Sequence, residues 1–183
     1  MCFFFSYNAL SLMSGGWLLV SNITMKSSSP PSHLPVKTSC RGITSDQMVL
    51  TKTAMNELRT HLSFTQLRFY CSKNNGRTIH VTTAANSIGE AVVQYFSGQT
   101  DVQPASCGSY VRMENDNSYL AGDCKKWKNG KWGIHKAKEN RLYNHVAYVY
   151  GTRRWLLSPP SVFECDDLLV GVTTGDFWKV YVR

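Results

Sequence analysis

The chain has 183 residues, of which 43% are hydrophobic and 12% aromatic, and its 20 basic residues against 12 acidic ones give a formal net charge of +8. This length fits one domain spanning residues 1–183, and the hydrophobic content excludes a disordered chain. No stretch reaches the ~18 consecutive apolar residues of a membrane span, and the basic residues are too scattered to predict specific nucleic-acid binding.

The amino-terminal segment 1–12 is atypical, because it is apolar but lacks the basic residues that open a secretory signal. It runs directly into residues 17–23, which are expected to form the first strand. We therefore expect the chain to be truncated at its amino terminus, without its true leader.

The first half of the chain contains the segments with regular periodicity. After a Ser/Pro loop at 27–32, Thr51 is expected to cap a helix over residues 51–62. Residues 66–71 and 78–83 predict a hairpin with Gly76 at a positive φ, and residues 91–96 predict another strand. The apolar positions of these segments and of the last strand predict one core, formed by Trp17, Leu19, Leu58, Leu67, Phe69, Val81, Val93, Phe96, Trp178 and Val180.

Periodicity is poor between residues 107 and 175. Short strands are expected at 146–150 and 154–157, and the last strand, 177–183, is expected to pair inside the sheet. The predicted fold class is therefore α+β: an antiparallel sheet with a packed helix, followed by a loop-rich half stabilised by disulfides.

Six cysteines lie far apart, and none forms the C-x-x-C pair that zinc and redox sites require. An even number at wide spacing favours disulfides in an oxidising compartment. We expect at least two bonds, with Cys2 left free, among Cys40, Cys71, Cys107, Cys124 and Cys165. The sequon Asn22-Ile23-Thr24 is also typical of a secreted glycoprotein.

Oxygen-bearing side chains gather in residues 114–118. Glu114 and Asp116 stand two positions apart, so both carboxylates can face one point, and the carbonyls of Ser118 and Leu120 can complete a calcium shell. The alternative is an ordinary Asx-rich surface turn.

Short segments throughout the chain resemble the fibrinogen-related domain, named after the carboxyl-terminal part of fibrinogen. The similar segments are Gly15-Gly16-Trp17, Leu67-Arg68-Phe69, residues 76–81, residues 89–96, Glu114-Asn115-Asp116, Gly122-Asp123-Cys124, Lys131-Trp132-Gly133 and residues 178–183. The resemblance implies an extracellular recognition domain with calcium beside a ligand pocket, and not an enzyme. Glu114 stands where the family has Asp. Because the next cysteine after Cys124 is Cys165, the family's loop disulfide would have to close this long span or be absent.

Three functions compete. The leading one is lectin-like recognition of glycans or acidic cell-surface or matrix components by the loop region 101–150 and the residues near Cys165. Trp127, Trp132 and Tyr143 would stack on sugar rings, and Lys125, Lys128 and Arg141 would supply charge; Trp155 is also expected on the surface. The alternatives are a cationic secreted matrix protein without a pocket and, with weaker support, a secreted hydrolase that uses His and acidic residues.

Overall fold

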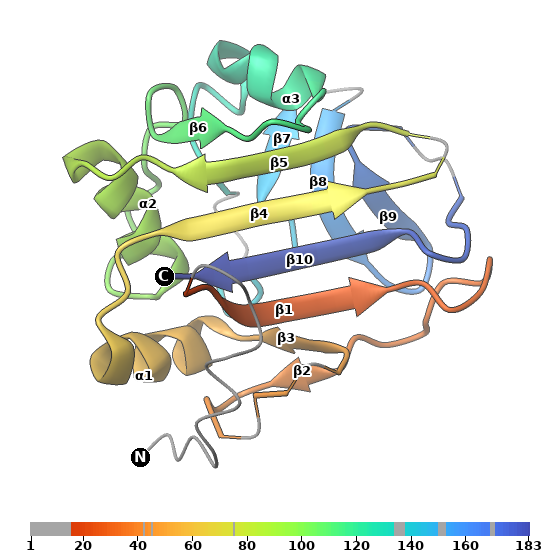
Figure 1. The fold of residues 1–183 in the computed structure, drawn as a ribbon, viewed down its shortest axis with the longest axis horizontal. Helices are drawn as coiled ribbons and strands as arrows, with labels where there is room; N and C mark the ends of the chain where they lie inside the picture. Colours follow the sequence, from red (N-terminus) through yellow and green to blue (C-terminus); the bar gives the residue numbers. More distant parts are fainter. Residues whose placement is uncertain are drawn as a thin grey trace.

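The computed structural model describes residues 16–41, 43–44, 46–74, 76–133, 138–149, 153–168 and 171–183. Its strands form a seven-stranded sheet in the order β2-β3-β1-β10-β4-β5-β6 and a three-stranded sheet in the order β7-β8-β9. The smaller sheet lies behind the larger one, and α1 and α2 lie at one end of the larger sheet (Figure 1). The elements are β1 (Leu18–Thr24), β2 (Val36–Lys37), β3 (Met48–Leu50), α1 (Lys52–Leu62), β4 (Leu67–Ser72), β5 (Thr78–Thr83), α2 (Ser87–Phe96), β6 (Tyr110–Arg112), α3 (Tyr119–Gly122), a 3-10 turn (Cys124–Lys126), β7 (Ala147–Val149), β8 (Arg153–Ser158), β9 (Val162–Cys165) and β10 (Phe177–Val182).

The large sheet is mixed rather than antiparallel throughout. Its strand pairs are antiparallel except for β2 and β3, which run parallel with Val36 opposite Val49. The predicted antiparallel sheet is therefore confirmed for the other strand pairs and wrong at this edge. The prediction for the last strand is confirmed, because β10 pairs with β1 on one side and with β4 on the other.

The helix α1 begins as predicted, with the side chain of Thr51 accepting a hydrogen bond from the Ala54 N–H at 3.2 Å. The predicted strand at residues 91–96 is wrong, because this segment is the second half of α2. The side chain of Asn86 caps that helix by accepting hydrogen bonds from two of its first N–H groups. Its buried positions, 89, 92, 93, 95 and 96, lie on one helical face, and this helical period outweighs the strand preference of paired valines. Gly76 is not among the glycines with positive φ, contrary to the prediction.

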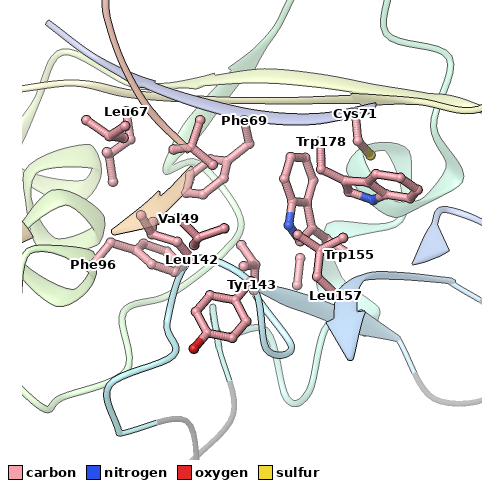
Figure 2. Packing of buried hydrophobic residues seen from close by; sticks show 14 of the residues in the cluster. Val49, Leu67, Phe69, Cys71, Phe96, Leu142, Tyr143, Trp155, Leu157 and Trp178 are labelled. Atoms are coloured by element: carbon pink, nitrogen blue, oxygen red, sulfur yellow. The ribbon is translucent and has the colours of Figure 1, made fainter. Parts of the chain in front are cut away.

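Both sheets share one hydrophobic cluster. Trp155 and Leu157 of β8 point toward Phe69 of β4 and Trp178 of β10 (Figure 2). The predicted core is confirmed except at the start of β1. There an irregularity in the register between Leu19 and Ser21 turns Leu18 and Val20 inward and leaves Leu19 half-buried.

Trp17 is buried but does not belong to this cluster. The guanidinium groups of Arg68 and Arg183 cover its ring instead.

Two disulfides join described cysteines, which confirms the prediction of at least two. Cys71 of β4 bonds Cys165 of β9, so this link ties the two sheets together, and Cys107 bonds Cys124. Cys124 therefore does not pair with Cys165. Cys40 is also disulfide-bonded, and Cys2, expected to be free, lies outside the described residues.

Within the described residues, no helix is long and apolar enough to cross a membrane.

Candidate functional site

The tryptophans expected on the surface lie in the core. Trp127 and Trp132 are each 1% exposed, and their rings meet edge to face with centroids 4.7 Å apart. Their indole N–H groups donate to Leu120 O at 2.5 Å and Ser109 Oγ at 2.8 Å. Trp155 is equally buried. The prediction that these rings stack on sugars is therefore wrong.

The turn that carries the flanking lysines explains this placement. Lys128, Asn129 and Gly130 all have positive φ, so the chain reverses sharply after Trp127. Lys125 and Lys128 stay exposed, as predicted, while the ring between them points inward. Tyr143, the third expected aromatic contact, is 8% exposed, and its hydroxyl donates to Asn140 Oδ1.

The carboxylate of Asp116, predicted to bind calcium, is occupied by groups of the protein. Its Oδ1 accepts hydrogen bonds from the His80 N–H at 2.9 Å and the Ser118 hydroxyl at 2.8 Å. Its Oδ2 accepts from Arg112 Nε at 2.5 Å. Asp116 thus connects its turn to β5, as the Asx-turn alternative predicts.

The structure also shows the surroundings of the other predicted calcium ligands, Ser118, Leu120 and Glu114. Ser118 Oγ accepts from the Ala121 N–H and caps α3, and the Leu120 carbonyl accepts from Trp127. Glu114 is exposed. Within the described ranges, no three His, Cys, Asp or Glu side chains form a group that can hold a metal ion. Calcium binding stays a prediction, and a cation at Asp116 would have to compete with Arg112.

Arg141, the remaining predicted contact, lies in the wall of a pocket of about 650 Å³. We call it the Arg141 pocket. It brings together the start of α1, the end of α2 and loop residues that follow both helices. Its lining residues are Lys52, Tyr95, Asp101, Val102, Gln103, Lys131, Lys138, Glu139 and Arg141.

Arg141 is only 5% exposed, and its contacts build the base of the pocket. Its guanidinium donates to the carbonyls of Tyr95 and Thr100 and to Asp101 Oδ1. The guanidinium carbon also lies 4.2 Å from the ring centroid of Tyr95. Because Arg141 is held by so many groups, its main effect is to fix the loops around the pocket.

Glycine is required beside this base. A Cβ at Gly133, whose φ is +72°, would lie 2.5 Å from the Tyr95 hydroxyl oxygen. Gln103 Nε2 donates to the carbonyls of Trp132 and Gly133 at 3.0 and 2.7 Å. Gln103 therefore links the wall of the pocket to the backbone of the buried Trp132.

Charged side chains line the rim of the pocket, and the ammonium group of Lys52 is held less tightly than Arg141. Lys52 Nζ lies 3.6 Å from Asp101 Oδ1 and 3.8 Å from Glu139 Oε1, beyond hydrogen-bond range. The hydrogen bond from Arg141, aided by the charge of Lys52, lowers the pKa of Asp101 below its usual value. Among the described lining residues, cations outnumber carboxylates by two, namely Lys52, Lys131, Lys138 and Arg141 against Asp101 and Glu139. An entering anion can therefore reach the exposed ammonium groups of Lys131 and Lys138.

A second hollow, of about 690 Å³, lies beside the Ser/Pro loop and includes Lys26, His33 and Asp46 in its lining. These three residues are exposed loop positions. We favour the Arg141 pocket because its base is anchored to both helices.

The residues that sequence reasoning missed are those contributed by the helices. Lys52 opens α1 and Tyr95 lies near the end of α2, and neither has a local signal of binding. The segment of Arg141 reaches α1 because the Glu139 carbonyl accepts from the Lys52 N–H at 2.9 Å and its carboxylate accepts from the Thr53 hydroxyl.

Comparison with protein-family models, with curated proteins and with solved structures gives no match for this chain. The resemblance to fibrinogen-related domains therefore rests on the short segments quoted above, and the pocket is interpreted from its own residues.

Proposed function

We propose that this chain is an extracellular recognition domain, similar to fibrinogen-related domains, that binds acidic glycans or other anionic cell-surface or matrix groups in the Arg141 pocket. The observation that carries the proposal is the excess of cations around a base rigidly built from Arg141 and Tyr95. The two disulfides support an oxidising, extracellular location.

The pocket offers the contacts that an acidic sugar needs. Lys131 and Lys138 are exposed and can bind a carboxylate or sulfate, while Gln103 supplies a polar group that can meet hydroxyls. Val102 is 72% exposed and gives an apolar surface for a sugar ring. We therefore place charge recognition on the lysines and ring recognition on Val102, in place of the buried tryptophans.

The proposal is of a binding protein and not an enzyme. A hydrolase would use a histidine with acidic residues, and no histidine is found among the described residues that line the Arg141 pocket. The two carboxylates in the lining are engaged by Arg141 and Lys52, which suits a structural role for them.

A pair of matched double variants tests the proposal against the cationic matrix protein. Lys131→Gln with Lys138→Gln removes two charges at the pocket, and Lys125→Gln with Lys128→Gln removes two charges at an exposed turn. Exposed ion pairs contribute about 0.2–1 kcal/mol each, so the pocket variant should bind an acidic oligosaccharide about 2–30 times more weakly. Calorimetric titration would measure this. Equal losses for the two variants would leave only net charge as the cause and refute the pocket.

A further inference from the structure

The four central strands of the large sheet contain basic residues and no acidic residue. Their outer face is turned away from the second sheet, and in Figure 1 the four central strands β1, β10, β4 and β5 present it to the viewer. None of the 12 acidic residues of the chain lies in these four strands. No described helix or strand is drawn across it in that view.

Strand register brings the cations of this face together. Lys179 of β10 pairs with Tyr70 of β4, which pairs with His80 of β5, so these side chains form one row across the sheet. Tyr181 and Arg68 form the neighbouring row, and Arg183 directly follows β10. We call Arg68, Lys179 and Arg183, with the rings that support them, the basic face.

Each cation rests on an aromatic ring. The guanidinium carbons of Arg68 and Arg183 lie 4.0 and 4.7 Å from the centroid of the Trp17 ring. Lys179 Nζ lies 4.9 Å from the centroid of Phe177. These cation–π contacts keep the side chains on the sheet and limit the entropy that binding would cost.

Two guanidinium groups on one indole ring repel each other. Burial and the nearby charge of Arg183 both lower the pKa of Arg68. The hydrogen bonds from Arg68 to Thr82 Oγ1 and from Arg183 to Gln66 Oε1 use one donor nitrogen of each group. Guanidinium has five N–H donors in all, so donors remain for a sulfate or carboxylate that would also relieve the repulsion.

We propose that the basic face binds a sulfated polysaccharide that lies along β10. Lys179 is the third residue of β10 and Arg183 follows its last residue, so the two cations are attached about 13 Å apart along the strand direction, which suits an extended chain of repeated negative charges better than a single small anion. This proposal does not depend on the Arg141 pocket.

The rings of the face argue against single-stranded nucleic acid as the occupant. Such a strand is held by bases that stack on free aromatic surfaces. Here Trp17 is covered by the arginines, and Tyr70 stacks on His80 with centroids 4.1 Å apart. A polysaccharide needs the cations and not the ring surfaces.

The test compares three double variants of the full chain, each lacking two charges. Lys179→Gln with Arg183→Gln alters the basic face, Lys131→Gln with Lys138→Gln alters the pocket, and Lys125→Gln with Lys128→Gln is the control. The probe is a heparin-derived oligosaccharide, with binding measured by calorimetry at an ionic strength of about 0.15 M. We expect the face variant to bind about five- to tenfold more weakly and the control variant to lose less than about twofold.

Three results would overturn the proposal: equal losses for the face and control variants, loss confined to the pocket variant, or a single-stranded oligonucleotide that binds more tightly than heparin and depends on the face residues. A measurement on the wild-type protein guards against misfolded variants. Bound oligosaccharide should protect Lys179 from amine acetylation while Lys125 stays reactive, and equal labelling of both lysines would also refute the proposal.

Discussion

Replacing Trp132 with alanine should destabilise the fold rather than remove a surface contact. The indole packs on Phe69 and Trp127 with centroids 5.1 and 4.7 Å away, and its N–H donates to Ser109 Oγ. Truncating a buried aromatic residue to alanine costs about 3–5 kcal/mol, and the lost hydrogen bond of a buried group adds about 1 kcal/mol. We therefore expect the free energy of unfolding to fall by at least about 3 kcal/mol.

Denaturant unfolding followed by circular dichroism would measure this change. Trp132→Phe keeps most of the packing and should cost less than the alanine variant, which keeps the comparison usable if the alanine variant does not fold. Lys131→Ala, at the exposed neighbour, is the control and should stay within about 0.5 kcal/mol of wild type. A loss of glycan binding by Trp132→Ala at unchanged stability would refute the reasoning and place the ring on the binding surface.

Three further predictions concern cross-links, cations and pH. Removing the bond between Cys71 and Cys165 by a double alanine variant should lower the unfolding free energy by up to about 4.7 kcal/mol, since it closes a loop of 94 residues; a loss below about 1 kcal/mol in denaturant unfolding would contradict this. Asp116→Ala should lower Tm equally with and without calcium, because Asp116 bonds protein groups, whereas a calcium-dependent rise in wild-type Tm that the variant lacks would establish the predicted calcium site. Burial raises the pKa of Tyr110 and Tyr181 to about 12. The folded state therefore holds these protons more tightly than the unfolded state, so stability present below about pH 10 should be lost as pH rises toward about 12, by at most about 2.7 kcal/mol for each tyrosine. In unfolding curves at several alkaline pH values, the variants Tyr110→Phe and Tyr181→Phe should lose less unfolding free energy with rising pH than the wild type does.

Local chemistry made part of the fold predictable. Thr51 and the apolar positions that follow it specify α1 within a few residues of sequence. The alternating residues of β4, β5 and β10 likewise specify strands with one buried face. In α2 the local signals conflicted, because paired valines favour a strand while Asn86 favours a helix start. Packing of one helical face on the core resolved the conflict.

The direction of side chains and the meeting of distant segments were decided only by tertiary structure. The lysines around Trp127 and Trp132 indicate an exposed turn, but the positive φ values at 128–130 turn the rings inward. The Arg141 pocket joins residues near 52, 95 and 141, and Cys71 bonds a partner 94 residues away. The sequence by itself determined which segments are regular and which residues can carry charge or form disulfides, because those properties are local. The pairing of cysteines and the composition of the pocket depend on how the two sheets pack, which no local pattern encodes.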